Sequence, residues 1–266
     1  MLRALVLGVI VLAALKLFVS WLEPHAVFFP SRGEQDTPAR LGIPFESLRL
    51  RVDDGIEISA WQLEPESPTA DIVYFHGNGG NLSLWLPVFA TLHHFGYRVL
   101  AVDYRGYGTS DGRPSERGLY ADAEAVARHA FANRQPGRPL LYWGRSLGGV
   151  IAAAAAREVP PDALILESTF ADKACVLRGN PVMRALNVFA SYRLDTVEHL
   201  RRFAGPILVV HAERDSVIPF RCGRELYERL GGRKTFVTLQ DGDHNDLYDV
   251  RNSGYWKPIH AFIEAL

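Results

Sequence analysis

Hydrophobic and polar positions divide the chain into one long apolar segment followed by many short apolar runs. The long segment, ALVLGVIVLAALKLFVSWL, follows Arg3 and carries a single charge, Lys16. A helix needs about 20 such residues, at 1.5 Å each, to cross the hydrocarbon core of a bilayer. Trp21 falls near the far boundary, where indole rings favour the interface. Residues 1–22 are therefore predicted to form a membrane anchor.

Two alternatives to an anchor fit the same segment. A cleaved signal peptide has a similar basic start and apolar middle, and it would leave a secreted or periplasmic protein. However, the following FVSWLEPHAVFFP contains no clean small-x-small cleavage site. A helix buried in the domain is the second alternative. In a spanning helix Lys16 has to extend its ammonium toward the headgroups. Arg3 before the span favours placing the rest of the chain opposite the cytoplasm.

Short apolar runs alternate with helical patterns beyond residue 44. Residues 23–44 contain several breakers and no clear period, which predicts a linker to a domain over residues 45–266. The predicted strands are Leu48–Val52, Glu57–Leu63, Ile72–Phe75, Arg98–Asp103, Leu140–Trp143, Ala163–Glu167, Ile207–His211 and Thr235–Leu239. The predicted helices are Leu82–Phe95, Ser115–Asn133, Leu147–Glu158, Phe220–Leu230 and Gly254–Ala265. Near-continuous apolar character in most of the strands is typical of strands buried on both faces.

This alternation predicts an α/β fold with a mostly parallel central sheet of about eight strands and helices on both faces. The first two strands are expected to form an antiparallel hairpin around Asp53-Asp54-Gly55. About 40 residues separate the sixth and seventh strands, longer than an ordinary connection, which predicts a small lid insertion over residues 169–204. An apolar stripe there fits either a lid or packing onto the domain; its members are Val182, Met183, Leu186 and Phe189.

Composition narrows the classes of protein that the chain can belong to. Its 266 residues are 48% hydrophobic and 22% charged, as in one ordinary globular domain. A net charge of −1 gives no electrostatic reason to expect nucleic acid. Cys175 and Cys222 lack metal-ligand spacing, so neither a disulfide scaffold nor a zinc site is expected. Two buried or semi-buried thiols are the simplest expectation, and the spacing leaves open whether they pair.

A candidate nucleophile lies where the fifth strand meets the following helix, in Gly144-Arg145-Ser146-Leu147-Gly148. Chance supplies G-x-S-x-G in roughly one chain in ten of this length, so the position of the motif carries the argument. A serine on a sharp strand-to-helix turn needs small residues two positions to either side. The helix N-terminus also favours negative charge developing there. Ser146 is therefore the predicted nucleophile, and an incidental serine in a glycine turn is the alternative.

A serine hydroxyl needs a base to take its proton. Among nine histidines, His244 lies in DGDHND, a turn-rich loop after the last strand, from which it can reach the serine. Asp215 follows the seventh strand on a similar loop and is expected to orient the imidazole. Its alternative role is that of a turn-forming or capping aspartate before Pro219. The aspartates closest to the histidine are expected to shape its turn; they are Asp241, Asp243 and Asp246.

A glycine-rich loop, His76-Gly77-Asn78-Gly79-Gly80-Asn81, follows the third strand. Its backbone N–H groups, with that of Leu147, are placed to stabilise an oxyanion beside the serine. Phosphate binding is the alternative, but the loop lacks both G-x-G-x-x-G and the Lys-Ser/Thr of a P-loop. His76 is expected to be a structural hydrogen-bonding residue.

Five motifs, HGNGGN, DYRGYGTSDG, GRSLGG, HAERDSVIP and GDHND, occur in an order that resembles the α/β-hydrolase superfamily. In detail they look like the membrane-anchored ABHD-type hydrolases, which include lipid hydrolases and protein-acyl thioesterases. The resemblance covers residues 44–266. It implies Ser146 as nucleophile, His244 as base and Asp215 as its partner, with oxyanion N–H groups from Asn78 and Leu147. It implies no metal and no organic cofactor.

The sequence thus predicts a serine hydrolase that cleaves carboxylic esters or thioesters through an acyl-serine intermediate. An apolar lid beside a membrane anchor suits a lipid-like acyl substrate. A serine peptidase with the same triad is one alternative. A membrane-tethered interaction domain without catalysis is another, which the intact triad disfavours. Ser146 argues against dehalogenases of related fold, which use an aspartate nucleophile.

Overall fold

A mixed central sheet organises the computed structural model, which describes residues 1–248 and 253–266. Within these residues the sheet has eight strands in the order β10-β9-β8-β7-β4-β6-β3-β2. They are β2 (Phe45–Arg51), β3 (Glu57–Leu63), β4 (Ala70–Phe75), β6 (Tyr97–Asp103), β7 (Leu140–Arg145), β8 (Ala163–Glu167), β9 (Ile207–Ala212) and β10 (Lys234–Leu239). The β2–β3 and β3–β6 pairs are antiparallel and the others are parallel. The predicted mostly parallel α/β sheet is confirmed.

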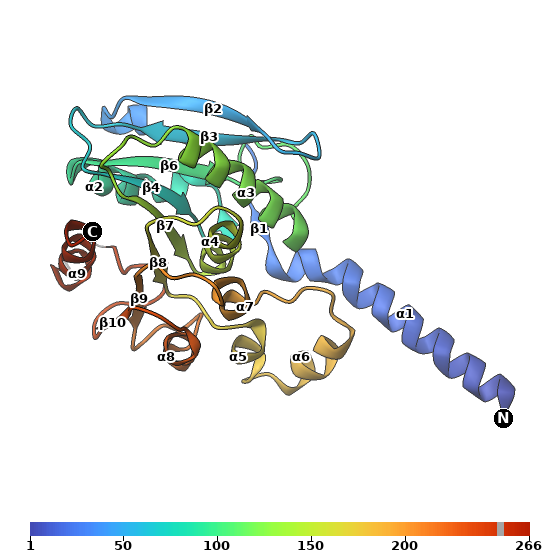
Figure 1. The fold of residues 1–266 in the computed structure, drawn as a ribbon. Helices are drawn as coiled ribbons and strands as arrows, with labels where there is room; N and C mark the ends of the chain where they lie inside the picture. The colour runs from blue at the N-terminus through green and yellow to red at the C-terminus, as the bar shows by residue number, and fades with distance from the viewer. Residues whose placement is uncertain (249–252) are drawn as a thin grey trace.

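Helices cover both faces of this sheet (Figure 1). One face carries α3 (Glu116–Ala132), α4 (Leu147–Glu158) and α8 (Phe220–Arg229), and the other carries α2 (Leu86–His94) and α9 (Ser253–Glu264). The 3₁₀ helix η2 (Leu82–Trp85) leads into α2. Because side chains alternate along a strand, neighbouring residues of β7 enter different cores. Tyr142 packs with the α4 face and Trp143 with the α2 face, which is why the strands are apolar at successive positions.

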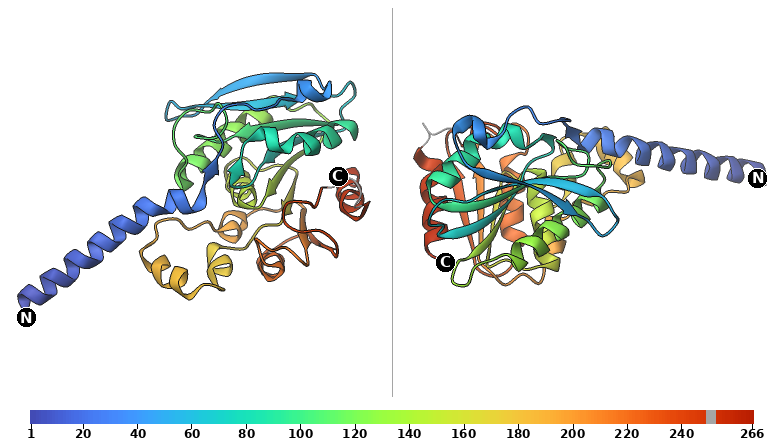
Figure 2. Two further views of the ribbon diagram at one scale, coloured as in Figure 1. Left: turned by 180° about the vertical axis from the view of Figure 1, so that it is seen from behind. Right: turned by 90° about the horizontal axis from the view of Figure 1, so that it is seen from above.

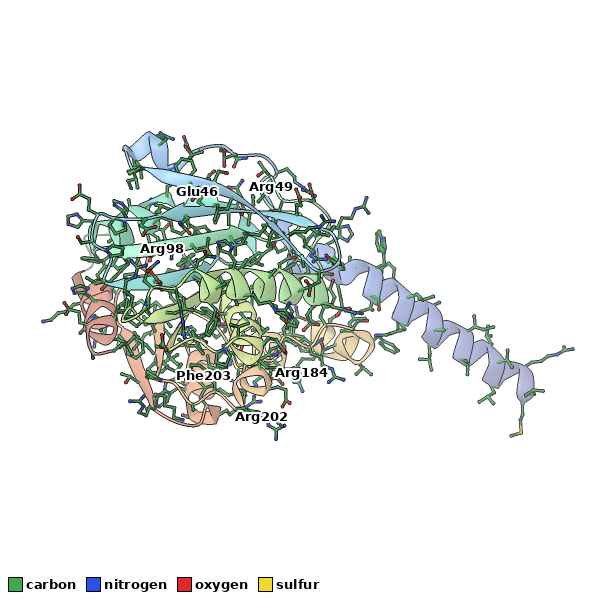
Figure 3. All side chains as sticks on the ribbon, turned by 45° about the horizontal axis from the view of Figure 1, so that its top comes forward. Glu46, Arg49, Arg98, Arg184, Arg202 and Phe203 are labelled. Atoms are coloured by element: carbon green, nitrogen blue, oxygen red, sulfur yellow. A yellow bond between two sulfur atoms is a disulfide. The ribbon has the colours of Figure 1, made fainter. Side chains whose placement is uncertain are left out.

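Helix α1 (Leu2–Val27) projects from the body of the domain (Figures 1 and 2). Side chains along most of its length extend into open space (Figure 3), and only Val19 and Glu23 are buried. Residues 23–44 are predicted to be a linker, but residues 23–27 belong to α1. A proline near the end of a helix removes one hydrogen bond without ending it, so α1 continues through Pro24.

The chain after α1 packs back onto the domain. Strand β1 (Phe29–Pro30) pairs in parallel with β5 (Gly79–Gly80), which lies in the glycine-rich loop. The 3₁₀ helix η1 (Pro38–Leu41) then leads to β2. These pairings satisfy backbone groups of a segment that has no hydrophobic period of its own. The glycine-rich loop is thereby attached to the residues that follow the apolar helix.

The predicted lid insertion, residues 169–204, consists of short helices at one end of the domain. They are α5 (Lys173–Leu177), α6 (Pro181–Leu186), η3 (Asn187–Phe189) and α7 (Thr196–Leu200). No residue of α6 is buried, and Val182 is 67% exposed. The apolar stripe therefore does not pack into the core of the domain.

Cys175 and Cys222 form a disulfide, so the expectation of two thiols is wrong. The fold brings α5 and α8 together and leaves the two Cα atoms 5.7 Å apart, within bonding range for cysteines 47 residues apart in sequence. Both cysteines are fully buried. The bond joins the start of the lid insertion to the helix that packs beside β9.

Candidate active site

Ser146 occupies a sharp turn between β7 and α4. Its φ of 55° lies in the left-handed region, which is uncommon for a residue with a side chain. The backbone N–H of Ser146 donates to the carbonyl of Glu167 at 2.9 Å, which fixes the turn against the neighbouring strand. The side chain is 5% exposed and faces a cavity. The predicted strand–turn–helix setting of this serine is thus present.

Two glycines allow this turn because other backbone passes very close to them. A Cβ at Gly144 would lie 2.2 Å from the carbonyl oxygen of Gly148. A Cβ at Gly148 would lie 2.0 Å from the carbonyl oxygen of Phe75, at the end of β4. Neither approach leaves room for a side chain. The N-terminus of α4 therefore sits directly on the strand ends that carry the glycine-rich loop.

His244 and Asp215 meet at the same edge of the sheet, beyond β10 and β9. Imidazole Nδ1 of His244 lies 2.8 Å from Asp215 Oδ2. The other oxygen, Oδ1, accepts backbone N–H groups from Val217 at 3.0 Å and Ile218 at 2.7 Å. Burial raises the pKa of Asp215, but the hydrogen bond and charge of His244 and the Ile218 N–H outweigh it, so the pKa lies below its ordinary value. An ionised Asp215 holds a proton on Nδ1 and leaves Nε2 as the proton acceptor.

The cavity in front of Ser146 also reaches the loop that carries Asp215. Ser146 lines it together with Val217 and Ile218, which belong to the loop that Asp215 organises. Among the described residues, no hydrogen bond joins the Ser146 hydroxyl to His244. Hydrogen bonds between catalytic groups are often long without substrate and shorten when it binds. The cavity thus reaches Ser146 and the loop that holds Asp215, whose carboxylate contacts His244.

Asp243 ties the histidine loop to the aspartate loop. Its carboxylate accepts the backbone N–H and the hydroxyl of Ser216, both at 2.7 Å, and the N–H of His244 at 2.6 Å. These bonds lower the pKa of Asp243 to about 2. Asp246 in turn accepts the N–H of Asp243. The acidic residues beside His244 therefore shape its turn, as the sequence predicts for Asp243 and Asp246.

A second histidine, His211, also lies close to the aspartate. Its Nε2 is 3.5 Å from Asp215 Oδ2 and donates to the carbonyl of Ile218 at 2.8 Å. Burial lowers the pKa of His211, which favours a neutral ring. The side chain has no exposed surface. We therefore regard it as a support of the aspartate loop and not as a base.

The glycine-rich loop lies against the serine. A Cβ at Gly77 would be 3.5 Å from Ser146 Cβ, and both Asn78 and Leu147 line the same cavity. The Asn78 carbonyl accepts the N–H of Phe29 at 2.9 Å, and the Asn78 side-chain amide donates to the Val27 carbonyl at 3.0 Å. These bonds attach the predicted oxyanion loop to the end of α1.

His76 holds the same loop from beneath. Its Nδ1 lies 2.7 Å from the Gly77 carbonyl oxygen and its Nε2 lies 3.3 Å from Asp103. Asp103 also accepts the N–H of Leu82 at 3.1 Å. With both ring nitrogens directed at the loop and its neighbouring strand, His76 has the structural role that the sequence predicts.

A buried ion pair lies directly below the serine, and sequence reasoning missed it. Arg145 Nε is 3.0 Å from Glu167 Oε1, and the guanidinium stacks 4.6 Å from the ring centre of Trp85. The other carboxylate oxygen accepts Trp143 Nε1 at 2.9 Å and the Tyr255 hydroxyl at 2.8 Å. An arginine inside the serine motif was a possible signal, but nothing in the sequence indicates its partner.

The cavity in front of Ser146 has a volume of about 330 Å³, near the lower end of the roughly 300–1,000 Å³ typical of ligand sites. One wall comes from α5, α6 and the segment after η3. The other comes from α1, whose part in the cavity was not predicted from the sequence. The apolar residues that line the whole cavity are Phe18, Val19, Leu22, Ala26, Val27, Leu147, Phe170, Val176, Leu177, Met183, Leu186, Ala190, Leu194, Val217 and Ile218. Such a lining suits an aliphatic group.

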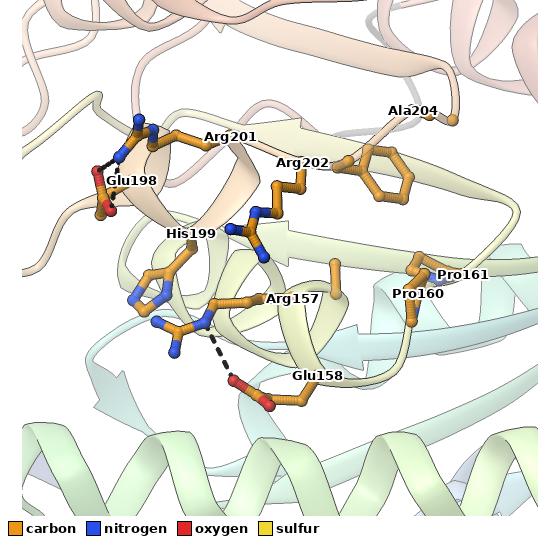
Figure 4. A pocket seen from close by; sticks show the side chains of 12 residues that line it. Arg157, Glu158, Pro160, Pro161, Glu198, His199, Arg201, Arg202 and Ala204 are labelled. Carbon is orange, nitrogen blue, oxygen red and sulfur yellow. Dashed lines mark hydrogen bonds and ion pairs between the residues drawn. The ribbon is translucent and has the colours of Figure 1, made fainter.

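A larger cavity, of about 840 Å³, lies at the opposite end of α4 and is not connected to this chemistry (Figure 4). Four of the five Arg and Glu side chains that line it form ion pairs with one another, and the fifth is Arg202. Arg157 pairs with Glu158 at 3.1 Å, and Arg201 pairs with Glu198 at 3.3 Å. Most of its charges are therefore paired within the protein, and we assign it no role.

The chain is similar in sequence to known proteins. A family model described as serine aminopeptidase, S33 matches residues 66–197. The α/β hydrolase domain-containing protein WAV2 of Arabidopsis thaliana is 30% identical, over 97% of this chain and 92% of its own length. The chain belongs to the α/β-hydrolase family. This chain is also 29% identical to an uncharacterized membrane protein of Saccharomyces cerevisiae, YNL320W, over 96% of this chain and 94% of that protein.

Two further similarities are to a lipase and to an esterase. The lysophosphatidylserine lipase ABHD12 of Danio rerio is 33% identical over 70% of this chain and 59% of its own length. The esterase Pf2001 of Pyrococcus furiosus superposes with a TM-score of 0.73, covering 89% of this chain and 98% of that one at 19% identity. This last likeness concerns the fold, and the resemblance predicted from the five motifs is confirmed at the level of the family.

Proposed function

We propose that this α/β-hydrolase is a membrane-anchored serine hydrolase that cleaves carboxylic ester or thioester bonds of lipid-like acyl substrates. One observation carries the proposal: Ser146, strained at a strand–helix turn, faces an apolar cavity beside the 2.8 Å His244–Asp215 pair. Ser146 is then the nucleophile, His244 the base and Asp215 the group that orients it. Residues 45–266 form the hydrolase domain, and residues 169–204 its lid.

In the acylation step, His244 Nε2 takes the proton of the Ser146 hydroxyl as Oγ attacks the substrate carbonyl carbon. The negative charge that develops on the carbonyl oxygen faces the backbone N–H groups of Asn78 and Leu147. A donor of this kind lowers the barrier by about 3–4 kcal/mol, a factor of roughly 10²–10³ in kcat. The N-terminus of α4 adds its dipole at the same place.

Collapse of this intermediate breaks the bond to the leaving group, which departs as an alcohol or thiol with the proton from His244. A water molecule, deprotonated by the same imidazole, then attacks the acyl-serine and releases the carboxylic acid. Asp215 stabilises the imidazolium in both steps without taking its proton. Its buried, ionised carboxylate and its fixed loop suit that role.

The cavity favours an acyl group over the N-terminus of a peptide, although the matching family model is described as an aminopeptidase. An aminopeptidase needs an acidic group to bind the substrate ammonium. Among the described residues that line the cavity, the one carboxylate is Glu23. Glu23 already accepts backbone N–H groups from Ser191 at 2.7 Å and Tyr192 at 3.0 Å. The name of the lipase relative agrees with an acyl substrate.

Labelling with a fluorophosphonate probe tests the nucleophile and its base. We expect the wild type to label, and Ser146→Ala, His244→Ala and Asp215→Asn to lose labelling while staying folded. Two control variants change residues that resemble the proposed catalytic ones in their surroundings but take no part in the proposed reaction. They are Ser168→Ala, whose serine also has a positive φ of 45°, and His211→Gln, whose histidine also lies beside Asp215. Labelling that persists in Ser146→Ala, or that disappears only in His211→Gln, refutes the assignment.

The anchor and its orientation are also proposals. Helix α1 is long and apolar enough to cross a membrane, and one relative is named a membrane protein. Disulfides persist in oxidising compartments, so the Cys175–Cys222 bond and the basic Arg3 together favour a domain on the non-cytoplasmic side. Alkylation of thiols in acid-quenched membranes should find both cysteines blocked until a reductant is added. Free thiols before reduction would place the domain in the cytoplasm.

A further inference from the structure

The last third of α1 forms part of the cavity that contains Ser146. Five apolar side chains of α1 line it: Phe18, Val19, Leu22, Ala26 and Val27. Their spacing of one, three and four residues places them on one face of the helix. Across the cavity lie Met183 and Leu186 of α6. The helix that would anchor the protein is therefore also one side of its substrate cavity.

A set of polar contacts fixes α1 to the lid at this place. Glu23 is a buried residue, and its carboxylate accepts the backbone N–H groups of Ser191 and Tyr192 at 2.7 and 3.0 Å. Lys16 Nζ donates to the Phe189 carbonyl at 2.8 Å and to the Ser191 hydroxyl at 2.9 Å. Bonds to charged groups are stronger than neutral ones. The arrangement of α1 and lid is thus held by specific bonds in addition to apolar contact.

The same region lies at the level where α1 would leave the bilayer. Beyond Lys16 the outer face of the helix remains apolar and open: Leu17 is 71% exposed and Trp21 is 64% exposed. On the lid, Val182 and Val188 are 67% and 80% exposed. Exposed apolar groups on both sides of the cavity, next to an interfacial tryptophan, indicate that the cavity opens at the hydrocarbon boundary.

We propose that a single acyl chain enters from the bilayer between α1 and α6 and packs along α1, with its carbonyl carbon at Ser146. The inference rests on the proposed function and names the acyl-binding site of that function. Leu22 and its neighbours determine selectivity for long chains, and Glu23 is a positioning residue that holds the lid against α1. A monoacyl ester or thioester suits this assignment, because the cavity has a volume of only about 330 Å³.

Selectivity for acyl-chain length tests this assignment. The same change, leucine to tryptophan, is made on two different faces of α1. In the wild-type full chain in detergent micelles, kcat/KM should rise by up to about fourfold for each methylene buried, until the cavity is full. Leu22→Trp places an indole in the cavity and should lower the ratio of palmitoyl to butyryl ester hydrolysis at least tenfold. Leu17→Trp, on the face away from the cavity, should leave both rates unchanged.

A crosslinking measurement covers the case in which Leu22→Trp fails to fold. A palmitoyl-length alkyl fluorophosphonate with a diazirine at the chain end would react at Ser146 of the wild type in vesicles. After irradiation, crosslinks should map to residues 18–27 or to α6, and Glu23→Gln should reduce the share on α1. Crosslinks that map only elsewhere, or equal chain-length ratios in the two tryptophan variants, overturn the inference.

The two proposals fail in different ways. Without fluorophosphonate labelling or butyryl ester hydrolysis by the folded wild type, the hydrolase proposal itself is wrong. Labelling and butyryl hydrolysis that proceed normally, with no dependence on the α1 face, leave the hydrolase proposal standing and refute only the acyl-binding role of α1.

Discussion

Replacing Glu167 with glutamine would isolate the contribution of the buried ion pair beneath Ser146. The change keeps the shape of the side chain and removes its charge. Arg145 is 2% exposed, so its guanidinium would remain in the interior without a counter-charge. Removing one partner of a buried pair costs about 3–5 kcal/mol. A domain is stable by only about 5–15 kcal/mol, so the variant should lose roughly a fifth or more of its stability.

The glutamine can still accept the hydrogen bonds of Trp143 and Tyr255 if its carbonyl oxygen takes the place of Oε2. Its amide group then faces the guanidinium, and donor meets donor. The expected loss therefore comes from the orphaned cation and not from these two bonds. The double variant Arg145→Met/Glu167→Gln removes that cation. It should be more stable than Glu167→Gln by about 2 kcal/mol or more, since a buried pair replaced as a unit is often neutral.

Urea unfolding of the full chain in detergent, followed by circular dichroism, measures both variants. The slope m should stay unchanged, because the same surface is exposed on unfolding. A cost below about 1 kcal/mol for Glu167→Gln would mean that the guanidinium stays solvated or paired in the folded protein. A double variant no more stable than the single one would contradict the reasoning in the same way.

Three further predictions concern the scaffold. Gly148→Ala should abolish fluorophosphonate labelling, because the new Cβ would lie 2.0 Å from the Phe75 carbonyl oxygen. Cys175→Ala/Cys222→Ala should lower the free energy of unfolding by about 4 kcal/mol on loop entropy, measured in urea, for a separation of 47 residues. His211 has a pKa lowered from 6.5, so the unfolded state binds its proton first as pH falls. Stability should therefore decline below pH 6.5, by at most about 1.4 kcal/mol per pH unit from this residue, and His211→Gln should lessen that slope.

The first of these predictions has a control variant, and the other two have outcomes that would contradict them. Gly179→Ala, whose Cβ would meet no atom within 4 Å, should label like the wild type. Unfolding midpoints that are equal with and without the disulfide would contradict the second prediction. Parallel pH profiles for wild type and His211→Gln would mean that this ring does not stay neutral in the folded protein.

Sequence periodicity was sufficient for the sheet, because its central strands consist mostly of consecutive apolar residues that are buried, as in β4, β7, β8 and β9. The boundaries of β3 and α4 agree with the prediction to the residue. The position of Ser146 could be predicted since glycine, serine and helix start are adjacent in the chain. His244 and Asp215 followed from the rule that loops after parallel strands share one edge of the sheet.

What the sequence did not indicate depends on contacts between distant segments. Glu23 meets Ser191 across 168 positions, and neither residue belongs to a motif. The partner of Arg145 is chosen by the register of β7 and β8, which pairs it with Glu167. The cysteine pairing likewise follows from how α5 and α8 pack. The predicted helix ends before Pro24, because proline lacks a backbone N–H. In the structure α1 continues to Val27, since the lost hydrogen bond lies near the end of the helix.

The pairing of β1 with β5 bears on how this enzyme can be inherited or engineered. Here Phe29 and Pro30, which follow α1 after Phe28, form β1 against the glycine-rich loop beside Ser146, and the Val27 carbonyl accepts a hydrogen bond from Asn78. A gene fusion that replaced the chain through Pro30 would therefore also remove contacts of this loop.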